Sequence, residues 1–204
     1  AVVNALVELP PGRAVIPEEF SLISYAFLHG DFMHLASNML FLWVFGDNVE
    51  DALGHVRYLV FYLLCAVAGA LMHGFLVPDS TAPLIGASGA ISGIIGAYLM
   101  LHPKVRIWVL AFGRIPLRLP AAIPLLAWIA YQLAAVFLMP EDTVSWAAHV
   151  GGFAAGVLLV LVLRRRGVPL FDRTIMLPEA VELSEGSPRP ASEAGTKAMP
   201  WGRG

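Results

Sequence analysis

The sequence predicts an all-α polytopic membrane protein, a bundle of apolar helices that cross a lipid bilayer. Of the 204 residues, 58% are hydrophobic and 14% are charged, whereas soluble domains average about 25% charged residues. The apolar residues are spread over several long blocks, which distinguishes a polytopic protein from a soluble domain with one anchor. The net charge of −2 gives no reason to expect nucleic acid as a partner.

Three regions follow one another along the chain. Residues 1–31 contain helix-breaking prolines and three glutamates, so we expect an outward loop at the membrane surface. Residues 32–165 are expected to form the transmembrane core. Residues 166–204 are rich in Pro, Gly, Ser and Glu, a composition that predicts a disordered cytoplasmic tail.

Five apolar segments of the core are candidate transmembrane helices. They are residues 32–46, 58–77, 87–102, 120–139 and 145–163. Residues 47–57 are expected to form a polar turn between the first two helices. Residues 104–119 carry four basic side chains between apolar ones, which is typical of a segment at the membrane interface.

The third candidate helix is too short to cross a bilayer. Residues 87–102 end at Pro103, and at about 1.5 Å per residue they reach only about 24 Å. The hydrocarbon core of a bilayer is about 30 Å thick. One end of this helix must therefore lie below the membrane surface, inside protein or a wet cavity.

Basic residues orient the chain. Arg164, Arg165 and Arg166 end the last span and indicate that the C-terminus is cytoplasmic. Counting back through the spans makes residues 104–119 cytoplasmic and turns the segments 1–31, 78–86 and 140–144 outward. An outward N-terminal segment leads us to expect a further helix before Ala1, six in all. A compact core with a short tail fits a bacterial or archaeal plasma membrane.

Four polar side chains lie within the spans, where burial in the membrane is costly: His34, Asn38, Ser88 and His149. His29 lies at the mouth of the first helix. Intramembrane polar residues of this kind often mark functional sites. All four lie towards the outward ends of their spans, so the predicted topology places them at one depth.

These residue types suit acyl-transfer chemistry. A neutral histidine, here His149, can take the proton of the Ser88 hydroxyl and return it to a leaving amine. No Asp or Glu lies in the middle of a span, so we expect a Ser–His dyad without a carboxylate. Burial without a carboxylate favours the neutral imidazole that a base requires.

The remaining residues complete the predicted site, which opens to the outer side. His34, Asn38 and the backbone N–H of Ser88 can donate to the oxyanion of a tetrahedral intermediate. Gly86 and Gly89 leave room around the nucleophile, so a substrate backbone can approach closely. No metal and no cofactor is required for this chemistry.

Other readings of the same residues remain open. Ser88 and Ser92 are also suited to close packing in a helix with Gly89, Gly93 and Gly96, a common pattern in membranes. His34 and Asn38 are equally able to hydrogen-bond between helices. His149 is also compatible with packing, a proton relay, or ligation of haem or metal. The pair Gly152 and Gly156 indicates close helix packing.

Three motifs, each on its own span, carry a resemblance to a known family. Gly86-Ala87-Ser88-Gly89, His34-Leu35-Ala36-Ser37-Asn38 and Ala148-His149-Val150-Gly151-Gly152 resemble the GxSG, HxxxN and AHxxG motifs of rhomboid intramembrane serine proteases. Residues 46–55 resemble the turn after that family's second helix. The resemblance covers roughly residues 20–165.

The resemblance implies a six-helix core, or seven helices with one added, and a serine endopeptidase that cuts single-span transmembrane proteins in or near their transmembrane segment. It implies the dyad Ser88 and His149, an oxyanion hole of His34, Asn38 and the Ser88 amide, and a supporting role for His29. Residues 120–139 and 140–144 would be its gate and cap. Some members carry an aromatic residue at the position of Ser92 that stacks on the catalytic histidine.

Two functions from other classes compete with a protease. One is a catalytically inactive relative that binds membrane helices, although such relatives typically lose the serine or the histidine. The other is a small transporter or cofactor protein that uses the histidines.

Overall fold

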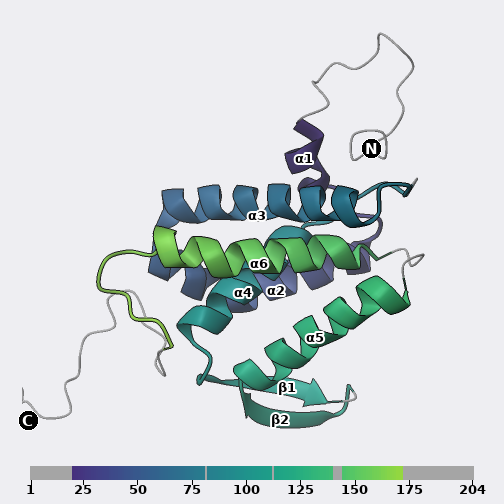
Figure 1. Ribbon diagram of the computed structural model, residues 1–204. Helices are drawn as coiled ribbons and strands as arrows, with labels where there is room; N and C mark the ends of the chain where they lie inside the picture. The colour runs from purple at the N-terminus through teal and green to yellow at the C-terminus, as the bar shows by residue number, and fades with distance from the viewer. Residues whose placement is uncertain (1–19, 81, 112, 140–143, 172–204) are drawn as a thin grey trace, which may run out of the picture.

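The computed structural model describes residues 20–80, 82–111, 113–139 and 144–171. The predicted N-terminal loop and C-terminal tail therefore lie mostly outside the described residues, as does most of the predicted outward loop 140–144. The described residues form a helical bundle with one hairpin (Figure 1). Its elements are α1 (Ser21–Ser24), a 3₁₀ turn (Tyr25–Phe27), α2 (Phe32–Leu53), α3 (His55–Leu76), α4 (Ser88–Leu101), β1 (Arg106–Ala111), β2 (Ile115–Pro120), α5 (Ala122–Leu138) and α6 (Trp146–Leu163).

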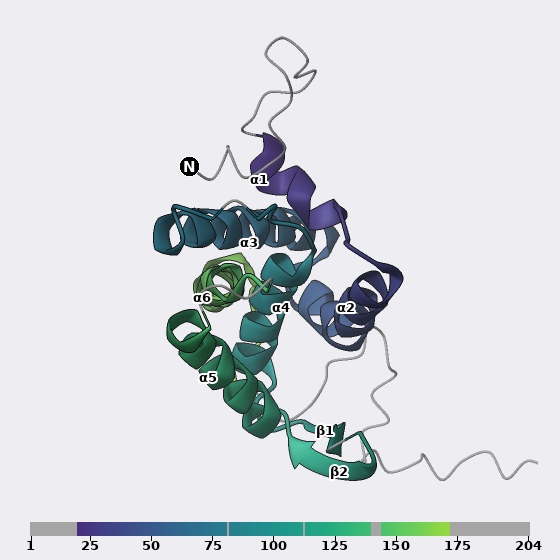
Figure 2. The same ribbon diagram turned by 90° about the vertical axis from the view of Figure 1, so that its right-hand side faces the viewer.

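The short helix α4 occupies the centre of the bundle. Seen in Figure 2, α2, α3, α5 and α6 surround it. Eleven of its fourteen residues are buried, which is why a helix of glycine, alanine and isoleucine is stable there. At about 1.5 Å per residue it is about 21 Å long. Its first residue, Ser88, is half-buried, and the sequence leads us to expect that this end lies below the membrane surface.

Helices α4 and α6 touch through glycines. A methyl group on Gly152 would collide with the carbonyl oxygen of Gly89, and one on Gly156 with that of Gly93. These obstacles are backbone atoms, which cannot move aside. The prediction that Gly152 and Gly156 allow close helix packing is confirmed, and the approach fixes the start of α4 against the start of α6.

The first helix is longer than predicted. We expected it to end at residue 46 before a polar turn, but α2 continues to Leu53 and α3 begins at His55. Val49, Ala52 and Leu53 are buried, so the inner face of this last part of α2 is apolar, while Asp47 is exposed and Glu50 and Asp51 are half-exposed. Only Gly54 separates the two helices, with a φ of +84° that favours glycine.

The segment 104–119, which we expect at the membrane interface, forms most of a β-hairpin. Strands β1 and β2 pair antiparallel with Trp108 opposite Arg118, and Gly113 lies in the turn with a φ of +67°. Along β1, exposed and half-buried side chains alternate. That period of two, with β-branched residues at every second position, favours a strand. The basic residues Arg106 and Arg118 are exposed.

Within the described residues, α3 and α6 are long and apolar enough to cross a membrane, whereas α4 and α5 are shorter apolar helices. The ends of α2, α4 and α6 meet on one side of the bundle. Arg165 donates to the carbonyl oxygen of Asp51, and the N–H of Phe171 donates to that of Met100 over 2.8 Å. The chain after α6 thus ties three helix ends together.

Candidate active site

Ser88 is the first residue of α4, and a glycine turn leads into it. Gly86 has a φ of +112°, a conformation that side chains rarely adopt. A Cβ there would lie 2.6 Å from Nε2 of His34. The N–H of Gly86 donates to the carbonyl oxygen of Tyr25 over 3.0 Å. Glycine is therefore required at this position for two reasons. The turn needs a positive φ, and the adjacent His34 ring leaves no room for a Cβ.

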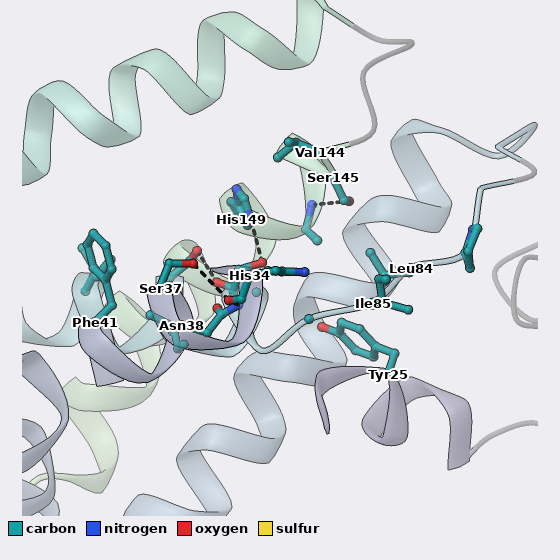
Figure 3. Close-up of a pocket in the computed structure, with 18 of the residues that line it drawn as sticks. Tyr25, His34, Ser37, Asn38, Phe41, Leu84, Ile85, Val144, Ser145 and His149 are labelled. Carbon is teal, nitrogen blue, oxygen red and sulfur yellow. Dashed lines mark hydrogen bonds between the residues drawn. The ribbon is translucent and has the colours of Figure 1, made fainter. Parts of the chain in front are cut away.

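His149 lies beside Ser88 although 61 residues separate the two. Figure 3 labels His149 among the residues that line the cavity, with His34 and Asn38. Nε2 of His149 is 2.8 Å from Oγ of Ser88. His149 is in the first turns of α6, whose N-cap is Ser145, and only 9% of it is exposed. The structure thus brings the two predicted dyad residues into direct hydrogen-bonding contact.

A third residue, Gln132 of α5, contacts the same imidazole. Its Oε1 lies 2.6 Å from Nδ1 of His149, and the side chain is buried. The rings of Trp128 and Trp146 lie 6.0 and 6.2 Å from the ring of His149, measured between centroids. Sequence reasoning missed Gln132, although an amide within the apolar span 120–139 is the kind of intramembrane polar residue that marks a site.

Ser92 takes no part in holding the histidine. Its Oγ donates to the carbonyl oxygen of Ser88 over 2.6 Å, within the same helix, and the residue is buried. The imidazole is contacted instead by α5 and by the start of α6, through Gln132, Trp128 and Trp146.

Helix α2 supplies the opposite wall of the site. Asp31 caps the helix, and its Oδ1 accepts a hydrogen bond from the N–H of His34 over 2.8 Å. Nδ2 of Asn38 donates to the carbonyl oxygen of His34 over 2.8 Å, and Oγ of Ser37 donates to the same oxygen. An amide NH₂ group has two hydrogens, so the bond to His34 leaves Asn38 one further donor.

The two histidines at the start of α2 contact each other. Their rings meet edge to face with centroids 5.2 Å apart. The N–H of Gly30 points to Nδ1 of His34 over 3.4 Å. Burial lowers the pKa of His29, and the nearby His34 lowers it further. The Nε2 atom of His29 is buried and has no hydrogen-bond partner within the described part of the chain.

These groups open on one cavity of about 520 Å³. His34 and Asn38 line it from α2, Ser88 from α4 and His149 from α6. Of the described residues that line the cavity, Asp31 alone bears a carboxylate. Most of the remaining wall is apolar, with Phe41, Ile91 and Trp128 among its residues. The wall of the cavity is therefore mostly apolar, with polar groups clustered at His34, Asn38, Ser88 and His149.

Two other histidines, to which the sequence assigns no role, make local contacts. Nδ1 of His73 lies 2.7 Å from Oγ of Ser145, the N-cap of α6. His55 pairs with Glu50 at the exposed end of α2. Among the residues that the structure describes, no group of three or more His, Cys, Asp or Glu side chains could hold a metal ion.

Comparison with known proteins identifies the fold. The family model of the rhomboid domain matches residues 17–166. The chain is 33% identical to Rhomboid protein 1, mitochondrial, of Saccharomyces cerevisiae, over 70% of this chain and 41% of that protein. It is 33% identical to RHOMBOID-like protein 5 of Arabidopsis thaliana, over 73% and 45%. It is 28% identical to Rhomboid-related protein 3 of Homo sapiens, over 84% and 43%.

The chain spans less than half the length of each of these relatives. The matched segment nevertheless includes every helix from α2 to α6 and all the residues that line the cavity. With its apolar helices around a short central helix, the chain belongs to the rhomboid family of polytopic helical membrane proteins.

Proposed function

We propose that this chain is an intramembrane serine endopeptidase that works by a Ser88–His149 dyad. The observation that supports this most is the 2.8 Å contact between Oγ of Ser88 and Nε2 of His149 at the start of a buried helix. A hydroxyl that packs between helices needs no histidine. A serine nucleophile needs a base within hydrogen-bonding distance, and it needs room for a substrate beside it.

Acylation follows from this geometry. His149 takes the Ser88 proton on Nε2 while Oγ attacks the carbonyl carbon of the scissile peptide bond. The resulting oxyanion collapses, the C–N bond breaks, and the imidazolium returns the proton to the leaving nitrogen. The product is an acyl-enzyme ester on Ser88. Water then attacks the ester, with His149 first accepting and then returning a proton, and releases the second product.

Three donors are proposed to stabilise the oxyanion. The N–H of Ser88 is at the first turn of α4, where amide groups have no acceptor within the helix and favour negative charge. Asn38 keeps one amide hydrogen free. At His34, the N–H of Gly30 donates to Nδ1, so in the neutral ring the proton lies on Nε2. That atom is beside Gly86, two residues before the nucleophile.

We propose single-span transmembrane proteins in the bilayer as substrates, cut in or near their membrane segment. The mostly apolar cavity supports this. For orientation, we propose a plasma or inner membrane with the C-terminus cytoplasmic and the site opening outward. The basic residues of the hairpin and of residues 164–166 lie on the exposed or half-exposed surface, away from the start of α4. Relatives are named mitochondrial and chloroplastic, and fractionation of cells that express the tagged chain tests the plasma-membrane assignment.

Cleavage of a reporter tests the proposal. The purified chain is reconstituted with a single-span membrane reporter, and the products are mapped by mass spectrometry. Ser88→Ala and His149→Ala should each lower the rate by at least about 10²-fold, since each removes one half of the proton transfer.

The controls are Ser24→Ala and His55→Ala, which remove the same groups at exposed positions. Both should cleave at the wild-type rate. Cleavage that persists undiminished in Ser88→Ala or His149→Ala would refute the dyad. A folded wild-type chain that binds the reporter without cutting it would instead support the catalytically inactive, helix-binding alternative.

A further inference from the structure

The buried amide on α5 has no function in a two-residue dyad. Gln132 is 3% exposed, and its carbonyl oxygen lies 2.6 Å from Nδ1 of His149. It is a polar residue in a span that is otherwise apolar from Leu125 to Leu138, apart from the hydroxyl of Tyr131. Burying an amide is costly unless it is hydrogen-bonded. The contact with His149 therefore offsets the cost of burying the Gln132 amide.

The identity of the Gln132 atom decides which nitrogen of His149 carries the proton. An amide oxygen can only accept a hydrogen bond, so Nδ1 must be the donor. In the neutral ring, Nε2 then has a lone pair, and it is Nε2 that faces the hydroxyl of Ser88. The other tautomer would direct an N–H at the hydroxyl and could not take its proton.

The same face of α5 also holds the plane of the ring. Trp128 precedes Gln132 by four residues, so both side chains project from one face of the helix. The Trp128 ring is inclined by 34° to the imidazole with centroids 6.0 Å apart. One helix thus supplies both a polar partner for Nδ1 and a neighbouring indole ring, whereas the Ser92 hydroxyl is bonded to the carbonyl oxygen of Ser88.

We propose that Gln132 is a positioning residue that fixes the tautomer and orientation of His149 for general-base catalysis. The inference rests on the proposed protease function. A carboxylate in this place would provide the same acceptor but would bury a charge among apolar helices, which is expensive. The neutral amide gives the base its tautomer without that charge.

Three variants separate positioning from packing. Gln132→Leu keeps the approximate volume and removes the acceptor. Gln132→Glu keeps both volume and acceptor and adds a charge. Leu133→Ala, on the exposed side of the same helix, is the control. Thermal unfolding of each full-length variant in detergent establishes that it is folded before kinetics are compared.

Gln132→Leu should lower kcat for the reporter by at least about 10-fold, the lower end of what losing the partner of a functional histidine costs. KM should stay within about twofold, because the residue does not line the cavity. Gln132→Glu should recover most of kcat. It should also move the acid limb of the pH profile to higher pH, because a carboxylate beside the ring favours the imidazolium. Leu133→Ala should match the wild type.

An unchanged kcat in folded Gln132→Leu would overturn the proposal. So would an equal loss in Gln132→Leu and Gln132→Glu with no movement of the acid limb, which is what a packing role predicts.

A second readout does not depend on activity. With ¹⁵N-labelled histidine, His149 is assigned among the six histidines as the resonances lost in His149→Ala. At a pH where the ring is neutral, wild type should show a protonated Nδ1 and an unprotonated Nε2, and Gln132→Leu should lose that preference. If Gln132→Leu loses the tautomer preference but the wild-type chain cuts no reporter, the protease proposal fails and the role of Gln132 in setting the tautomer stands. If the chain cuts the reporter but the His149 tautomer is the same in wild type and Gln132→Leu, only the inference about Gln132 fails.

Discussion

We propose that the two cavity histidines use opposite tautomers, and the neighbours of each Nδ1 atom give the reason. At His149, Nδ1 faces the oxygen of Gln132, so this nitrogen carries the proton and Nε2 is free to act as a base. At His34, Nδ1 faces the N–H of Gly30, so Nε2 carries the proton and can donate. One residue type thus serves two roles, because an amide oxygen accepts and a backbone N–H donates.

Gly86 tests the role of His34. Gly86→Ala should lower kcat sharply, because the new Cβ would meet the His34 ring at 2.6 Å, and misplacing a catalytic group by about 1 Å costs about 10²-fold. Steady-state cleavage kinetics measure the loss. Gly167→Ala is a matched control, since Gly167 has a φ of +91° with nothing within 4 Å of its Cβ position. If the two variants cleave equally well, the His34 ring does not need its present position.

At the scale of elements, the site depends on how closely α4 and α6 approach. Ser88 and His149 come from these two helices, and glycines on both allow the contact. Membrane helices associate through packing rather than through expulsion of water, so small residues at the interface largely decide the approach. We therefore expect the dyad distance to depend on the contact between Gly89, next to Ser88, and Gly152, about one turn after His149.

Gly152→Ala should destabilise the fold and separate the dyad. Its methyl group would strike the carbonyl oxygen of Gly89. Overpacking of this kind costs about 1–3 kcal/mol, which should exceed the gain of about 1 kcal/mol in helix propensity from Gly to Ala. Thermal unfolding in detergent gives the change in stability.

Gly46→Ala is the comparison for that measurement. Its methyl group would meet the hydroxyl of Tyr58 at 2.8 Å, and the end of a side chain can move aside. Gly46→Ala should therefore be milder than Gly152→Ala. A larger loss of stability in Gly46→Ala than in Gly152→Ala would show that α4 and α6 are not packed as tightly as proposed.

Across the whole molecule, the two ends of the bundle differ in character. The start of α4 lies at the cavity end, whereas Arg165 and residue 171 tie α2, α4 and α6 together at the other end. The exposed arginines of the hairpin follow the end of α4. We expect these ends to face opposite sides of the membrane, with the basic end in the cytoplasm.

Cysteine labelling tests this orientation. The chain has one cysteine, Cys65, which is buried, so Cys65→Ala provides a background without reactive thiols. In intact cells, a membrane-impermeant thiol reagent should label Ala82→Cys, whose position is exposed between α3 and α4. It should label Ile115→Cys in the hairpin only after permeabilisation. Labelling of Ile115→Cys alone in intact cells would invert the proposed topology.

The sequence predicts those features that depend on local pattern. The short, buried α4 follows from its length, and the joint depth of Ser88, His149, His34 and Asn38 follows from counting spans. The hairpin was missed because Arg106 and Arg118 were weighed as charges, whereas the β-branched residues Ile107 and Val109 at alternate positions were not weighed as a strand. The extension of α2 was missed because Asp47, Glu50 and Asp51 suggest a turn although the face between them is apolar.

Counting spans cannot predict which side chains touch across helices. The 2.8 Å bond between Ser88 and His149 and the 2.6 Å bond to Gln132 depend on the angles at which α4, α5 and α6 pack. The sequence could have singled out Gln132 as a candidate, since it is an amide within an apolar span. Which nitrogen of which histidine it would face is a matter of tertiary structure.

One measurement tests the central claim most directly, namely whether His149 activates Ser88. The folded chain in detergent is treated with a fluorophosphonate, and the adduct is located by peptide mass spectrometry. We predict one adduct, on Ser88, that is lost in His149→Ala and kept in His55→Ala. An adduct on another serine, or labelling of Ser88 at an equal rate in His149→Ala, would contradict the proposed mechanism.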